Sequence, residues 1–110
     1  RYFTFSTSQL GIDLANIPNS YDLSQNYPNP FNPSTKISYQ LGRGEVVKFS
    51  IFDLNGNLIK NILNNKVNAG RGHVYWDGKN ELGQNVSGGI YLYTIETPSF
   101  LKTKKMVLLK

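Results

Sequence analysis

The sequence contains no cysteine and only one histidine, His73, among its 110 residues. The absence of cysteine excludes disulfides, thiolate metal sites and a cysteine nucleophile, so the fold has to be held by its core alone. A Ser-His-Asp arrangement would have to recruit His73 from beside a strand, and the carboxylates fall in or beside turns or on exposed strand positions. We therefore expect a domain that is not an enzyme and carries no cofactor.

Long apolar runs are also missing. No stretch approaches the roughly 18 apolar residues that a membrane-spanning helix needs, so we expect no membrane span. The net charge of +5, from 12 Lys and Arg against 7 Asp and Glu, weakly favours anionic partners. Most lysines are scattered singly instead of forming a stripe with interleaved aromatic residues, so the sequence does not indicate nucleic-acid binding.

Alternation of apolar and polar residues predicts an all-β domain. The predicted strands cover residues 1–7, 36–41, 46–54, 58–63, 73–76, 90–97 and 100–109. The dipeptide Asn55-Gly56 predicts a type I′ hairpin turn, Pro98-Ser99 predicts a second hairpin, and residues 64–72 read as a polar loop. Short strands at this spacing indicate an antiparallel sandwich of two sheets.

The first twenty residues differ from the rest of the chain. Residues 8–20 have no sustained periodicity and include Pro18, which indicates a linker. We expect residues 1–20 to be this linker and the tail of a preceding domain, with the sandwich from 21 to 110. No signal peptide is visible after Arg1, so we expect the chain to be the C-terminal piece of a longer protein. Mobile backbone makes residues 8–24 the expected site of proteolytic removal.

A stiff segment, NYPNPFNPST at residues 26–35, precedes the first strand of the predicted sandwich. Pro28, Pro30 and Pro33 lie within six positions. Each proline fixes its own φ, lacks an N–H donor and pushes the preceding residue towards extended geometry. With Tyr27 and Phe31 as apolar anchors, this segment is expected to form a fixed corner on the first sheet.

Three segments carry a family resemblance: NYPNPFNPSTKISYQL at residues 26–41, YWDGKNELGQNVSGGIYLY at 75–93 and KKMVLLK at 104–110. In this order they resemble the C-terminal sorting domain (type A) of type IX secretion cargo proteins. The middle segment is also similar to the Ig-like domain of flagellar hook-capping proteins. The resemblance covers about residues 21–110 and implies an Ig-like antiparallel β-sandwich of about seven strands. Its structural motif residues are Pro28, Pro30, Phe31, Pro33, Trp76, Asp77, Gly78, Gly89 and Tyr91.

The resemblance implies a secretion signal that directs a cargo domain, N-terminal to this chain, through the periplasm and the outer-membrane type IX translocon. We expect the chain to be a monomer. It also implies removal by a sortase-like surface protease, which leaves the cargo secreted or on the cell surface. The residues that match the family's terminal motif, and are therefore expected to be recognised by the translocon, are Lys104, Lys105, Met106, Val107, Leu108, Leu109 and Lys110.

The final strand has apolar residues on both faces, whereas a sandwich strand normally shows one face to water. Met106 and Leu108 point one way, and Val107 and Leu109 point the other. One pair is expected in the core. The other pair is either covered by the proline segment or offered to a partner, and the sequence leaves open which pair is which.

Four alternatives remain at this stage, two for sites and two for function. Trp76, Tyr91 and Tyr93 either stack on sugar rings or anchor the core. The loop at residues 77–81 either binds calcium through three oxygen-bearing side chains or forms an Asx turn at Asp77. The main alternative function is a carbohydrate-binding or spacer β-sandwich of a secreted hydrolase, which, unlike a sorting signal, need not be terminal. A hook-capping domain is the second alternative function. It is disfavoured because the segments at residues 26–35 and 104–110 match the sorting-domain pattern.

Overall fold

The computed structural model describes residues 20–110, which form seven strands and no helix. The strands are β2 (Asp22–Leu23), β3 (Thr35–Leu41), β4 (Glu45–Asp53), β5 (Leu58–Val67), β6 (Gly70–Trp76), β7 (Gly89–Thr97) and β8 (Phe100–Leu108). The predicted all-β fold is confirmed. The strand predicted at residues 1–7 and the linker at residues 8–19 lie outside the described residues. Within residues 20–110, no helix is long and apolar enough to cross a membrane.

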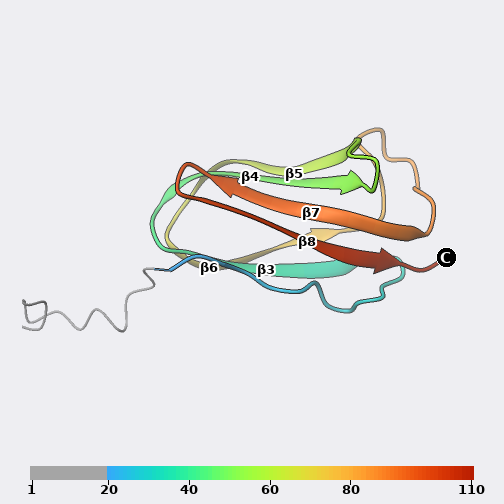
Figure 1. Ribbon diagram of the computed structural model, residues 1–110, viewed down its shortest axis with the longest axis horizontal. Coiled ribbons are helices and arrows are strands. Elements are labelled where there is room, and N and C mark those ends of the chain that lie inside the picture. Colours follow the sequence, from blue (N-terminus) through green and yellow to red (C-terminus); the bar gives the residue numbers. More distant parts are fainter. Residues whose placement is uncertain (1–19) are drawn as a thin grey trace, which may run out of the picture.

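The strands form two antiparallel sheets that lie face to face (Figure 1). One sheet has the order β2-β3-β6 and the other has the order β5-β4-β7-β8. The chain passes between the sheets at residues 42–44, 68–69 and 77–88. β2 and β8 are edge strands of different sheets and contact each other, so these two edges lie on the same side of the sandwich.

The core lies between the sheets, and strand alternation places it there. In β3 the odd-numbered residues are buried, and the same two-residue period holds in β7. Every second side chain therefore meets the opposite sheet. The buried apolar residues are Leu23, Phe31, Ile37, Tyr39, Leu41, Val47, Phe49, Ile51, Val74, Trp76, Tyr91, Tyr93, Ile95, Met106 and Leu108.

The polar loop predicted at residues 64–72 is wrong. Asn64, Asn65 and Lys66 continue β5 and pair with β4, and β6 begins at Gly70, so only residues 68–69 connect the two strands. β5 lies at the edge of its sheet, where polar side chains remain in water and keep the ladder hydrogen bonds. The polar composition therefore reflects exposure and not a lack of pairing.

The hairpin predicted at Asn55-Gly56 exists, but its turn is not type I′. That turn needs positive φ at both central residues, and among the described residues only glycines have positive φ. Gly56 has φ of 86° and donates its N–H to the carbonyl of Asp53 (3.1 Å). The Asp53 carboxylate also accepts from the backbone of Asn55 and Asn57, at 2.9 Å each. These bonds favour a three-residue loop that ends on a left-handed glycine, and they hold the pKa of Asp53 below its usual range.

The proline segment connects the two sheets instead of packing on the first sheet alone. Tyr27 forms an antiparallel bridge with Lys36 of β3, and Phe31 forms a parallel bridge with Leu108 of β8. Phe31 is buried, and its ring centroid lies 5.7 Å from that of Trp76. Tyr27 is 80% exposed, so its predicted role as an apolar anchor is wrong, because it shares the outward face of Lys36.

A buried polar cluster fixes the start of this segment. Asn26 is 2% exposed, and its side-chain amide donates to the Thr35 hydroxyl (3.0 Å) and to the carbonyl of Pro28 (3.1 Å). Its backbone N–H donates to the hydroxyl of Tyr93 (3.0 Å), which in turn donates to the carbonyl of Ser24 (2.7 Å). Burial raises the pKa of Tyr93 to about 12. Satisfied buried polar groups of this kind specify one geometry for the corner.

The chain is already anchored at Tyr21, which narrows the predicted site of proteolysis. The Tyr21 ring stacks on Phe100, with centroids 5.2 Å apart, and its hydroxyl donates to Glu45 (2.6 Å). This bond lowers the pKa of the Glu45 carboxyl. Asp22 and Leu23 then form β2, and Leu23 is buried. Residues 21–24, which the sequence placed within the mobile segment, are therefore part of the folded domain.

Candidate functional site

The residues predicted to meet a translocon occupy the second half of β8 and the two positions after it. Met106 and Leu108 are buried at 0% and 2% exposure, whereas Val107 is partly exposed and Leu109 is 50% exposed. The question left open by the sequence is therefore answered. Met106 and Leu108 belong to the core, and the pair Val107 and Leu109 is available on the other side.

The lysines of the same motif remain in contact with water. Lys105 and Lys110 are exposed, and Lys104 is partly exposed although it shares the inward side of β8 with Met106. The fully buried apolar positions of this strand are therefore Met106 and Leu108. The motif thus presents positive charge beside the apolar pair.

Val107 belongs to a larger apolar area on the outer face of the four-stranded sheet. Leu58 of β5 pairs with Phe52 of β4, which pairs with Leu92 of β7, and Ile90 of β7 pairs with Val107 of β8. Leu58 is 48% exposed, and Ile90 is 40% exposed. Single exposed apolar residues are ordinary, but a contiguous set across four strands is a feature of interaction surfaces. We call these five residues the outer apolar patch.

The backbone edge of β8 next to this patch is already paired with the proline segment. Phe31 donates its N–H to the carbonyl of Val107 (2.9 Å), and Leu109 donates to the carbonyl of Phe31 (2.8 Å). The N–H of Val107 donates to the side-chain oxygen of Asn29 (3.0 Å). The proline segment therefore covers the edge of the strand and leaves its outer face open. Recognition at this place has to use side chains, because no strand can add here.

The structural motif residues around Trp76 form a packed corner. Trp76 is buried, its ring meets Tyr91 edge-on at 5.2 Å, and its indole N–H donates to the carbonyl of Lys79 (2.9 Å). The Asp77 carboxylate accepts from the N–H of Lys79 (3.2 Å), which is the predicted Asx turn. Gly78 has φ of 76°, and a Cβ there would lie 3.3 Å from the carbonyl oxygen of Pro33. This corner supports the end of β8 from inside.

The sugar-stacking alternative at Trp76, Tyr91 and Tyr93 is wrong, because all three rings are buried. Burial raises the pKa of the Tyr91 hydroxyl, which donates to the carbonyl of Ser87 (2.6 Å). Gly89, the remaining motif residue, opens β7 opposite Leu108. These residues hold the last hairpin in place and offer no surface to a ligand.

The side-chain oxygens proposed as calcium ligands accept hydrogen bonds from backbone N–H groups instead. Asp77 accepts from Lys79, and Glu81 accepts from the N–H of Asn61 (3.0 Å), which ties the loop to β5. The side-chain oxygen of Asn80 accepts from Leu82 and from Gln84, at 3.0 Å each. Within residues 20–110, no three His, Cys, Asp or Glu side chains gather as a metal site. The loop is shaped by Asx-type turns.

Sequence reasoning missed most of the outer apolar patch. The last strand was singled out because both of its faces carry apolar residues. The predicted strands at residues 46–54 and 90–97 share this property. Phe52, Ile90 and Leu92 alternate with core residues in those strands. Only the sheet order, which places β4, β7 and β8 side by side, shows that these residues form one area.

The fold and this arrangement define the chain as an Ig-like β-sandwich. The chain belongs to the FlgD Ig-like domain family, whose model matches residues 31–99. The matched region ends before β8 and begins after most of the proline segment. Among curated proteins, none matches the sequence at a significant level.

Solved structures share the fold. Dimeric latent PorU from Porphyromonas gingivalis has a TM-score of 0.62 at 24% identity, over 81% of this chain and 9% of that chain. PorZ, a surface component of the type IX secretion system of the same bacterium, has a TM-score of 0.54 at 19% identity, over 87% of this chain and 12% of that one. FlgD from Xanthomonas campestris has a TM-score of 0.53 at 23% identity, over 84% of this chain and 70% of that one. This chain therefore spans only a small part of PorU and of PorZ.

Proposed function

We propose that this domain is a non-catalytic C-terminal sorting signal that directs a cargo protein through the outer-membrane type IX translocon. The observation that carries the proposal is the terminal motif at residues 104–110. Within this motif, Met106 and Leu108 are buried and serve the folded core, whereas Val107 and Leu109 are not part of the core. An apolar pair held in place beside exposed lysines is suited to recognition by a partner protein.

The position of the motif supports this role. Its backbone is fixed on one side by β7 and on the other by the proline segment, so the outward side chains are presented in one geometry. A preorganised surface loses less conformational entropy on binding than a mobile tail. The residues that make this edge, 29–31 and 107–109, lie within two of the three segments that carry the resemblance to sorting domains. We place the translocon contact on Val107, Leu109 and the adjoining outer apolar patch.

Removal of the signal by a sortase-like protease fits the N-terminal boundary of the fold. Ser20 accepts hydrogen bonds from the side chain of Gln40 (3.3 and 3.4 Å), the ring of Tyr21 stacks on Phe100, and β2 follows at once. A protease needs backbone that is not paired in a sheet. We therefore place cleavage before Tyr21, within residues 8–20. The released cargo is then secreted into the medium or stays at the cell surface.

The test is export of a reporter protein fused upstream of residues 1–110 in a bacterium that has a type IX translocon. We expect the reporter outside the cell, with a C-terminus within residues 8–20 by mass spectrometry. A strain without the translocon should retain the intact fusion in the periplasm. Export that does not depend on the translocon, or a fusion that stays in the periplasm of the wild-type strain, would contradict the proposal.

A further inference from the structure

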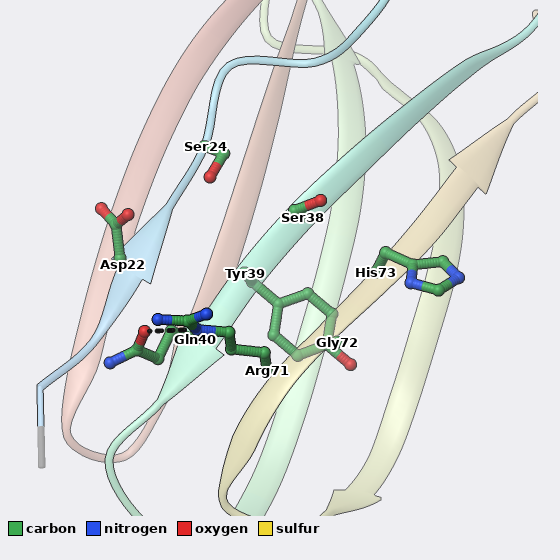
Figure 2. A pocket seen from close by; sticks show the side chains of 8 residues that line it. All are labelled: Asp22, Ser24, Ser38, Tyr39, Gln40, Arg71, Gly72 and His73. Atoms are coloured by element: carbon green, nitrogen blue, oxygen red, sulfur yellow. Dashed lines mark hydrogen bonds between the residues drawn. The ribbon is translucent and has the colours of Figure 1, made fainter. Parts of the chain in front are cut away.

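The outer face of the three-stranded sheet carries a polar cavity of about 440 Å³ that the sorting role does not use. Asp22 of β2 lies beside Gln40 of β3, and Gln40 lies beside Arg71 of β6, so three polar side chains form a row across the sheet. Ser38 and His73 form the next row. Figure 2 shows these side chains on one side of the sheet, from Asp22 at one end of the cavity to His73 at the other.

The polar groups of this cavity suit a ligand that is rich in hydroxyl groups. The Nε of Arg71 donates to the side-chain oxygen of Gln40 (3.3 Å), which orients the guanidinium across the sheet. Asp22 supplies an acceptor, Arg71 supplies donors, and the Ser38 hydroxyl supplies both. Donors and acceptors that lie side by side in this way match the hydroxyls of a sugar, each of which donates and accepts. They do not match a phosphate, which Asp22 would repel.

Two exposed aromatic rings lie on the same face beyond the cavity. Tyr27 and Tyr75 both pair with Lys36, from opposite sides, so all three side chains point outward in one row. The two tyrosines are 80% and 62% exposed. Their backbones are two strand spacings apart, about 10 Å. The ring of His73 meets Tyr75 edge-on at 5.2 Å and connects this row to the cavity.

We propose that this face binds a neutral saccharide chain, with pyranose rings stacked on Tyr75 and Tyr27 and hydroxyl groups bonded in the cavity. The C–H face of a pyranose packs on an aromatic ring, and the ring edge presents its hydroxyls to polar side chains. Asp22 offsets the charge of Arg71, so the cavity itself does not select an anion. This site lies on the opposite sheet from the outer apolar patch and is independent of it.

The test is a titration of the full 110-residue chain with cellohexaose and with mannohexaose. Binding is measured by calorimetry and by changes in the amide chemical shifts. We expect at least one of these neutral probes to bind with a dissociation constant of about 1 mM or tighter, and to shift the amides of Ser38, His73 and Tyr75. Tyr75→Ala and Arg71→Ala should each weaken binding about tenfold or more. Their melting temperatures should stay unchanged, because both side chains are exposed.

Two control variants give this result its specificity. Leu82→Ala, at an 82% exposed loop position, and Ile90→Lys, in the outer apolar patch, should bind as the wild type does. The proposal is overturned if neither neutral probe binds, or if Tyr75→Ala and Arg71→Ala leave the affinity unchanged. It is also overturned if only the charged probe hexagalacturonate binds and added salt abolishes that binding, which would be electrostatic adsorption.

Discussion

Tyr93 shows, at the scale of a residue, how much of this fold depends on contacts that are distant in sequence. Its hydroxyl joins β7 to Ser24 and Asn26, and its ring stacks on Phe49 of β4, with centroids 6.2 Å apart. The two-residue period of the strand predicts that Tyr93 is buried but says nothing about its hydroxyl. Likewise, the sequence shows Asn26 only as the first residue of the proline segment and gives no sign of its partners. The bonds between these residues depend on pairings that the sequence does not display.

Removing the Tyr93 hydroxyl should destabilise the domain with little change in packing. Tyr93→Phe leaves the N–H of Asn26 and the carbonyl of Ser24 without this partner, and Asn26 is buried. We expect a loss of about 1–3 kcal/mol in the free energy of unfolding, measured by urea denaturation. The control is Tyr75→Phe, at an exposed position, which should change stability by less than about 0.5 kcal/mol. Equal effects of the two variants would contradict the role of the buried cluster.

The same residue gives the domain a sensitivity to alkali. The folded-state pKa of Tyr93 is raised by burial to about 12, so the folded state favours the neutral hydroxyl. The resulting stabilisation is complete below the unfolded pKa of about 10 and is lost as the pH rises through the folded pKa. We expect the melting temperature to fall more steeply between these two pH values in the wild type than in Tyr93→Phe. Parallel curves for the two proteins would disprove this assignment.

At the scale of an element, the proline segment is the clearest case of partial prediction. Three prolines predicted stiffness, and Phe31 was correctly chosen as an anchor. The sequence offered this segment as a cover for the outer face of the last strand, whereas Phe31 pairs with the edge of that strand at Leu108 and leaves its outer face open. Tyr27 was wrongly chosen, since an aromatic residue beside proline carries no sign of which face it takes. The last strand was predicted with both faces apolar, and the structure decided which face is core.

Phe31 should therefore stabilise the domain strongly, whereas Tyr27 should not. Phe31→Ala removes a buried ring that contacts Trp76 and opens a cavity beneath the end of β8. We expect a loss of about 3–5 kcal/mol in the free energy of unfolding, measured by thermal or urea denaturation. Tyr27→Ala, an aromatic truncation only four residues away, should stay within about 0.5 kcal/mol of the wild type. A larger loss for Tyr27→Ala would show that the proline segment packs differently.

At the scale of the whole molecule, most strands and their inward faces could be read from the sequence, but β2, the second half of β5 and the assignment of strands to sheets could not. Alternation around Ile37, Phe49 and Tyr93 located β3, β4 and β7 with small errors at their ends. Which strands share a sheet depends on connections such as residues 77–88, whose path is set by Asx turns and by the Glu81 contact with β5. The outer apolar patch and the polar cavity both arise from sheet order, so neither was predicted.

The domain should fold without disulfides or metal and melt in one cooperative step, because one continuous core joins both sheets. Calcium should leave its melting temperature unchanged, since Asp77 and Glu81 are engaged with backbone N–H groups. Calorimetry with and without low millimolar calcium measures this. A rise of several degrees that Asp77→Ala abolishes would mean that the loop binds the metal after all.

The central claim, that the last strand has one face for folding and one for export, is tested most directly by two double variants. Circular dichroism and the reporter export assay are applied to both, with Val46→Lys on the same outer face, at 52% exposure, as the control. Met106→Lys/Leu108→Lys should unfold, because the free-energy cost of burying two charges exceeds a typical free energy of unfolding of about 5–15 kcal/mol. Val107→Lys/Leu109→Lys should fold and melt as the wild type does yet fail to be exported, while the control is exported. A folded Val107→Lys/Leu109→Lys domain that is exported at the wild-type level would contradict the account.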